Sequence, residues 1–205
     1  MSNWPSTSAD QTDLAQTAMI AIYLSSHGTI TENTMSAQRP MAHLIYGPTA
    51  AGKSTYARAL AAEHNAVRFA IDEWMHALFA ADMPERLEMA WALTRVARCQ
   101  AQVWSIAKQI LGTGTDVVLE LGLLRANDRK AAAAEVEAAG FPMCFHFVDA
   151  DLSLRRQRVL RRNAEKGKTY SFDVTPPMFE AMESYFERPS AGELSNSKCI
   201  QGQTK

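Results

Sequence analysis

Nine consecutive residues have the composition and spacing of a phosphate-binding loop. They are Gly47, Pro48, Thr49, Ala50, Ala51, Gly52, Lys53, Ser54 and Thr55, and the first eight follow the pattern G-x-x-x-x-G-K-[ST]. A loop containing glycine presents several backbone N–H groups to a phosphate, and the start of the following helix adds its positive dipole end. We therefore predict a P-loop that binds ATP, with Lys53 on the β- and γ-phosphates and the Ser54 hydroxyl on Mg²⁺.

Two acidic residues follow short apolar runs farther along the chain. Asp72 follows Phe69-Ala70-Ile71, and Glu120 follows Val117-Val118-Leu119. Carboxyl ends of strands in an open α/β sheet point into the ligand crevice. Asp72 is therefore a candidate base for an acceptor hydroxyl, although Asp is also a favoured N-cap residue. Glu120 is placed like the acid that holds a Mg²⁺-bound water or helps to activate the acceptor, since burial without such a partner is costly.

Basic residues are concentrated in one predicted helix. Residues 155–168 contain seven of the 21 Lys and Arg residues, in a chain of net charge −1. Arg155, Arg158 and Arg162 are spaced by three and four, so they share a helix face. That face could close over ATP as a lid and stabilise charge on the γ-phosphoryl oxygens. A solvated helix and a nucleic-acid patch, with Tyr170 and Phe172 nearby, are the alternatives.

Two further arginines follow the strand that ends at Glu120. Arg125 and Arg129 lie just beyond it, where they could reach the transferring phosphate or an anionic substrate. Solvated arginines on a helix surface are an equally good interpretation. We retain Arg125 as a candidate catalytic residue.

Short apolar runs alternate with longer helical patterns, which position these residues. The runs predict strands over residues 43–46, 66–71, 116–121 and 143–148, and a fifth around 198–200 is a further hypothesis. The nearly continuous apolar run before Glu120 is typical of a parallel strand covered on both faces. Helices are expected from 53 to about 61 and from 73 to about 81, and over about 84–110, 127–139, 152–166 and 175–187.

Strands that alternate with helices predict an α/β fold. We expect a three-layer P-loop NTPase sandwich with a nucleotide-kinase-like parallel sheet and a helical lid. Residues 1–38 are rich in Ser, Thr, Asn and Gln, so we expect a weakly ordered N-terminal extension with a short helix over 14–24. The kinase domain is expected over 39–194 and a C-terminal tail over 195–205. Met35 and Met41 are alternative translation starts.

Composition narrows the choice of compartment and partner. The net charge of −1 gives no global attraction to nucleic acid or to an anionic membrane. Cys99, Cys144 and Cys199 have neither disulfide-framework nor zinc spacing, which favours buried, reduced thiols. The apolar run 14–24 is too short to cross a bilayer, and no Lys or Arg precedes Arg39 to form a signal peptide. We therefore expect a cytoplasmic protein.

The ordered motifs together resemble a known family. Residues 42–194 are similar to small bacterial predicted P-loop kinases of the AAA-domain type, which are related to chloramphenicol phosphotransferase and zeta-toxin kinases. Besides the P-loop, the matching segments are Ile71-Asp72-Glu73-Trp74, Val117–Gly122, Arg125 with Asp128-Arg129, His146-Phe147-Val148-Asp149, Arg161-Arg162-Asn163-Ala164-Glu165 and Phe186-Glu187-Arg188-Pro189.

The resemblance implies ATP, Mg²⁺ and phosphoryl transfer to a hydroxyl. It assigns phosphates and metal to Lys53 and Ser54, places Asp72 toward the acceptor, and assigns nucleotide contact to Arg158 or Arg162. The chain departs from the family after its third strand. Where such proteins often have Asp followed by Gly-Phe-Trp, this chain has Glu120-Leu121-Gly122-Leu123-Leu124, with a longer acid and no aromatic wall.

Three functions are compatible with these features. The first is a kinase for a small hydroxylated molecule of the antibiotic, sugar or nucleotide-sugar class. The second is a polynucleotide-end kinase, against which the near-neutral net charge argues. The third is a module that binds ATP for interaction without phosphoryl transfer. Guanine-specific Asn-Lys-x-Asp and the transporter motif Leu-Ser-Gly-Gly do not occur in the sequence.

Overall fold

The structure is a computed structural model of the 205-residue chain. It describes residues 39–84, 89–167 and 173–202. The helix expected over 14–24, the alternative start Met35, and the aromatic residues Tyr170 and Phe172 lie outside these ranges. In the described part of the chain, no helix is long and apolar enough to cross a membrane.

A five-stranded parallel sheet forms the centre of the fold. The strand order is β2-β3-β1-β4-β5, and every neighbouring pair is parallel. This confirms the predicted α/β class, including the fifth strand. The strands are β1 (Ala42–Tyr46), β2 (Val67–Ala70), β3 (Val117–Glu120), β4 (Met143–Asp149) and β5 (Ser197–Gln201).

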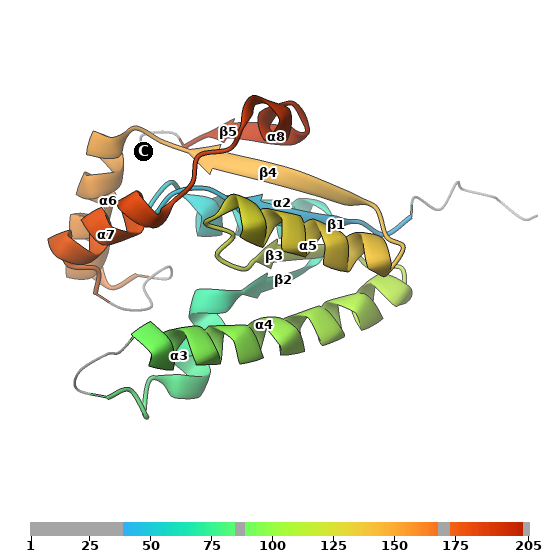
Figure 1. The fold of residues 1–205 in the computed structure, drawn as a ribbon, viewed down its shortest axis with the longest axis horizontal. Coiled ribbons are helices and arrows are strands. Elements are labelled where there is room, and N and C mark those ends of the chain that lie inside the picture. Colours follow the sequence, from blue (N-terminus) through green and yellow to red (C-terminus); the bar gives the residue numbers. More distant parts are fainter. Residues whose placement is uncertain (1–38, 85–88, 168–172, 203–205) are drawn as a thin grey trace, which may run out of the picture. The chain divides into compact units, whose positions relative to one another are not determined.

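Helices cover both faces of this sheet. Residues alternate between the faces, so Leu44 and Tyr46 of β1 pack in the core cluster that includes α4 and α5, whereas Ile45 packs in the cluster that includes α2. Figure 1 shows α6 and α7 together at the end toward which β4 points. The helices are α2 (Lys53–Glu63), α3 (Ile71–Phe79), α4 (Met89–Gly112), α5 (Ala126–Ala138), α6 (Leu152–Glu165), α7 (Pro176–Tyr185) and α8 (Ala191–Ser195).

The central strands are buried along their whole length. All five residues of β1 and all four of β3 are buried. A strand covered by helices on both faces needs a nearly unbroken apolar run, which is the pattern that both strands have. Because all strands run the same way, their carboxyl ends meet at one edge of the sheet, and the P-loop follows β1 at that edge.

Two element boundaries differ from the sequence expectation near functional residues. The second strand ends at Ala70 instead of Ile71, and α3 already begins at Ile71. Asp72 therefore lies in the first turn of α3, with Ala70 as the N-cap, so the capping interpretation of Asp72 is wrong. The last long helix stops at Tyr185, which leaves Glu187 and Arg188 in the following connection.

The segment after α7 returns to the sheet and is held there by ion pairs. Arg129 of α5 is only 3% exposed and donates from Nε and Nη2 to the two oxygens of Glu193 on α8. Glu187 accepts from Arg125 Nε and from the backbone N–H of Ala126, so it caps α5. These bonds join the C-terminal segment to the domain.

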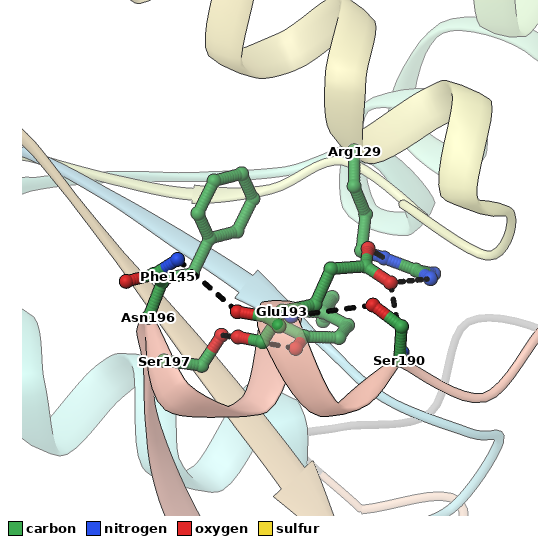
Figure 2. Close-up of a pocket in the computed structure, with 8 residues that line it drawn as sticks. Arg129, Phe145, Ser190, Glu193, Asn196 and Ser197 are labelled. Atoms are coloured by element: carbon green, nitrogen blue, oxygen red, sulfur yellow. Dashed lines mark hydrogen bonds and ion pairs between the residues drawn. The ribbon is translucent and has the colours of Figure 1, made fainter.

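A hollow of about 320 Å³ lies beside this ion pair. Figure 2 shows Arg129 and Glu193 facing each other there, with Ser190, Asn196 and Ser197 around them. Its polar side chains already bond within the protein: Ser197 Oγ donates to Glu193 O, and Ser190 Oγ accepts from the Glu193 N–H.

Strand β5 pairs with β4 and so continues the sheet beyond residue 194, where the sequence suggested that the domain ends.

We expect Glu193→Gln to destabilise the fold and to change its acid sensitivity. The bond from Arg129 lowers the pKa of Glu193 from 4.5 to about 2. A lowered carboxyl pKa contributes stability that is present above pH 4.5 and is lost as the pH falls toward 2. The variant should lose about 2 kcal/mol at neutral pH, because Arg129 stays buried without its partner and Glu193 is partly screened by solvent.

Urea unfolding at several pH values between 2 and 7 measures this effect. Glu165→Gln is the matched control, since Glu165 forms an i,i+4 pair with Arg161 in which both side chains are more than half exposed. That control should change stability by less than about 0.5 kcal/mol. Equal losses in the two variants would show that the Arg129–Glu193 pair is not special.

Candidate active site

The P-loop joins the end of β1 to the start of α2 and needs glycine at its first position. Gly47 has φ 143°, and a Cβ at this residue would lie 2.0 Å from the Val148 carbonyl oxygen of β4. Any side chain there would collide with backbone. Gly52 has φ 107° and forms the N-cap of α2, so the backbone N–H groups at the helix start are directed into the loop.

Lys53 lies across the mouth of this loop. Its Nζ donates to the carbonyl oxygens of Gly47 and Pro48, each at 2.9 Å. Burial lowers the pKa of Lys53, while the nearby Glu120 and Asp72 carboxylates raise it. The ammonium group is thus held against the backbone of the P-loop.

Ser54 and Glu120 form a pair of oxygen donors beside Lys53. The Ser54 hydroxyl donates to Glu120 Oε1 at 2.6 Å, and Glu120 is only 8% exposed. Burial raises the pKa of Glu120, and the Ser54 bond, Lys53 and Arg68 act in the opposite direction. A hydroxyl and a carboxylate side by side supply the hard oxygen ligands that Mg²⁺ prefers, and Mg²⁺ keeps several waters besides.

Arg68 is a site residue that the sequence interpretation missed. Its Nη1 donates to Glu120 Oε2 at 3.1 Å, and its Nη2 bonds to both oxygens of Glu73. One signal was present: Arg68 is a charged residue in an otherwise apolar strand. In the observed register Arg68 pairs with Val118, two residues before Glu120, so both side chains lie on the same sheet face.

Asp72 is electrostatically coupled to this group. Loss of hydration raises its pKa, and Lys53 and Arg162 counteract that rise. The residue nevertheless remains exposed to solvent at the start of α3. Asp72 keeps exposed surface while neighbouring elements crowd its carboxyl group near Lys53, and a carboxylate in this position is suited to accept a proton from a substrate hydroxyl.

The predicted arginine face of α6 contacts the P-loop. Arg155 Nη1 donates to Thr49 O at 3.4 Å, and Arg158 Nη1 donates to Ala50 O and Ala51 O at 3.2 and 3.0 Å. Arg155 is 1% exposed and also binds both carboxylate oxygens of Glu183 on α7. Arg155 therefore ties α7 to the P-loop, whereas Arg158 braces the loop from α6.

Arg162 occupies a different position from its two helix neighbours. It interacts electrostatically with Lys53 and with Asp72. Its Nε is buried and has no hydrogen-bond partner within the described part of the chain. A guanidinium N–H of this kind, close to Lys53, fits the anionic phosphates of a nucleotide.

Arg125 lies outside this cluster of contacts. Its Nε donates to Glu187 Oε1 at 2.9 Å, and its guanidinium stacks over the Tyr185 ring at 5.0 Å from the centroid. Arg129, which follows one turn later in the sequence, is bonded to the Glu193 carboxylate. A catalytic role for Arg125 stays a prediction. In that role the Arg125 guanidinium would have to break its bond to Glu187.

The residue after β5 supports the back of the P-loop. Gly202 donates from its backbone N to Asp149 O at 2.6 Å, and a Cβ on it would lie 2.4 Å from Ala51 O and 3.1 Å from Arg158 Nη1. The chain therefore passes so close behind the loop that only glycine fits.

We expect Gly202→Ala to destabilise the domain by about 1–3 kcal/mol, because the added methyl group must push the loop or β5 away. ATP affinity should fall as well. Differential scanning calorimetry and ATP titration measure the two effects. Gly112→Ala is the matched control, because nothing lies within 4 Å of a Cβ at that position. A Gly202 variant as stable as that control would contradict the close packing.

A protein-family match covers most of the described domain. The family model described as an AAA domain matches residues 43–189, which is more than half of the chain. The chain belongs to this AAA-domain family. No curated protein matches the AAA-domain chain significantly.

Solved structures show which fold this AAA-domain protein shares. A presumed kinase from Chloroflexus aurantiacus is 20% identical, with a TM-score of 0.63 over 80% of this chain and 88% of that one. A gluconokinase from Sinorhizobium meliloti is 16% identical, with a TM-score of 0.53 over 82% and 86%. The APS kinase of Mycobacterium tuberculosis is 21% identical, with a TM-score of 0.51 over 74% and 84%. The AAA-domain chain therefore has a P-loop kinase-like fold.

Proposed function

We propose that the protein is an ATP-dependent kinase that transfers the γ-phosphate of ATP to a hydroxyl group of a small molecule. One observation carries the proposal. Lys53 Nζ donates to the P-loop carbonyl oxygens of Gly47 and Pro48 and interacts electrostatically with Asp72, so a cation suited to phosphate and a candidate base share one site. The P-loop kinase-like fold supports the same reaction class.

Each residue of the candidate site has its own role in the proposed phosphoryl transfer. ATP supplies the γ-phosphoryl group, and Mg²⁺ supplies positive charge on its oxygens. Lys53 exchanges the Gly47 and Pro48 carbonyl oxygens for phosphate oxygens, and Arg162 contacts phosphate from the lid. Ser54 and Glu120 hold the metal or its water.

Asp72 removes the proton of the acceptor hydroxyl. The acceptor oxygen forms its bond to the γ-phosphorus as the bond from that phosphorus to the leaving ADP oxygen breaks. The raised pKa of Asp72 improves it as a base.

The proposed acceptor belongs to the antibiotic, sugar or nucleotide-sugar class. A cytoplasmic location is part of the proposal, since Cys99, Cys144 and Cys199 are all free.

Label transfer tests the proposal. The purified chain is incubated with γ-labelled ATP and Mg²⁺ against pools of sugars, nucleotide-sugars and hydroxylated antibiotics, with Lys53→Met and Asp72→Asn as controls. We expect label in one pool, lost in both variants. ATP binding without transfer to any pool would favour the interaction module.

A polynucleotide acceptor is the second enzyme candidate, because one structural neighbour is the Pnkp1/Rnl/Hen1 RNA repair complex, at 18% identity and a TM-score of 0.56. The match covers 77% of the chain described here but only 46% of the chain in that complex. An oligonucleotide with a free 5′-hydroxyl belongs in the screen, and a steep loss of rate with salt would identify it.

A further inference from the structure

A second group of chemically active side chains lies at the amino ends of the central strands, whereas the P-loop lies at their carboxyl ends. His43 is in β1, His64 caps the C-terminus of α2, and Asp116 immediately precedes β3. Asp116 lies four residues before Glu120, a distance of roughly 13 Å along a strand. This group is therefore separate from the nucleotide site.

The three side chains converge on one point. His43 Nε2 lies 3.4 Å from Asp116 Oδ2, and His64 Nδ1 lies 3.3 Å from the same oxygen. All three ligand atoms lie within 4.8 Å of one another. Metal–ligand bonds of about 2.0–2.1 Å in a tetrahedron place ligand atoms about 3.3–3.4 Å apart. The two separations from Asp116 Oδ2 match such an edge, and both also lie within hydrogen-bond range in the metal-free chain.

Other groups hold the candidate ligands in place. His146 Nε2 is 3.1 Å from His43 Nδ1, and the Tyr56 hydroxyl is 2.8 Å from His146 Nδ1. The backbone N–H of Met41 donates to Asp116 Oδ1 at 2.8 Å, which leaves Oδ2 for the shared point. Partners of this kind on the far nitrogen of a ligating histidine and on a ligating carboxylate are typical of metal sites.

The types of ligand atom indicate which class of ion would bind. Two imidazole nitrogens and one carboxylate oxygen suit Zn²⁺ and its divalent neighbours, whereas Mg²⁺ prefers oxygen alone. The side chains of His64 and Asp116 are 32% and 21% exposed, so the fourth position can be reached by water.

We propose that His43 Nε2, His64 Nδ1 and Asp116 Oδ2 form a Zn²⁺-type site with an open fourth position. The ion joins the C-terminus of α2 to β1 and to the connection that enters β3. Binding fixes the tautomers: His43 Nδ1–H donates to His146 Nε2, and His146 Nδ1–H donates to Tyr56. The site is independent of the proposed kinase reaction.

Cobalt titration of the tag-free, chelator-treated full chain tests the site. Co²⁺ is added in the presence of excess Mg²⁺, which occupies oxygen-rich sites, and visible absorption reports tetrahedral coordination. We expect one equivalent of Co²⁺ per chain, displaced by Zn²⁺. His64→Gln should weaken binding more than about 100-fold, because even supporting residues of metal sites are worth 10–100-fold.

Two control variants locate the ion. His76→Gln makes the same change at an exposed histidine of α3 and should leave cobalt binding unchanged. Ser54→Ala removes the proposed magnesium ligand and should also leave it unchanged. Circular dichroism confirms that each variant is folded. The proposal is overturned if the wild-type chain takes up no stoichiometric Co²⁺, or if folded His64→Gln binds it as tightly as wild type. In that case the cluster is a hydrogen-bonded brace between strands.

Discussion

Asp72→Asn should lower kcat by about 10²–10⁴-fold while ATP affinity stays near the wild-type value. The substitution keeps the shape of the side chain but removes its ability to accept a proton, and general-base catalysis contributes rate factors of this size. Asp72 couples electrostatically to Lys53 and Arg162, so a small change in nucleotide affinity is expected as well. Steady-state transfer rates and isothermal titration with ATP separate the two effects.

Asp82→Asn is the matched control for this experiment, because Asp82 is an exposed residue in the turn after α3. It should leave both rate and affinity unchanged. An Asp72 variant with the wild-type transfer rate would remove Asp72 as the base. A variant that lost ATP binding as completely as transfer would instead indicate damage to the P-loop.

Lys53→Met should lower kcat/KM by roughly 10²–10³-fold or more, since it removes a positively charged donor from the charge that develops on the phosphate in a partly buried site. The structure adds a second expectation. Lys53 bonds to the Gly47 and Pro48 carbonyls, so its loss leaves two loop acceptors without that donor and loosens the free enzyme. ATP affinity should therefore fall along with the rate.

Thermal melts with and without ATP measure the loosening, and transfer assays measure the rate. Lys108→Met is the control, because Lys108 forms an exposed surface pair with Glu135 on α5. Wild-type transfer by Lys53→Met would mean that the P-loop lysine does not act on phosphate, and the kinase proposal would fail with it.

The nucleotide site was predictable because its parts are encoded locally. Gly47 to Thr55 form one contiguous motif between a predicted strand and a predicted helix. Glu120 stands at the end of a strong apolar run, and its contact with Ser54 follows from the parallel sheet. The spacing of Arg155, Arg158 and Arg162 predicted a shared face, and two of them donate to P-loop carbonyls.

Contacts between distant segments were not predictable in the same way. Arg68 reaches Glu120 only because β2 and β3 pair in one register, 52 residues apart in the chain. His43 and His146 lie 103 residues apart, and neither has a partner at helical or motif spacing. The end of α7 was placed too late because nothing in the sequence marks Glu187 as the cap of α5.

The position of Gly202 behind the P-loop has a consequence for protein synthesis. The loop is made early, but β5 follows the other four strands of the sheet in the chain. While the ribosome is still extending α7 and α8, the nascent domain lacks both the edge strand and the backbone that supports Ala51. The P-loop therefore gains its backing last, after β5 has emerged from the exit tunnel and joined the sheet.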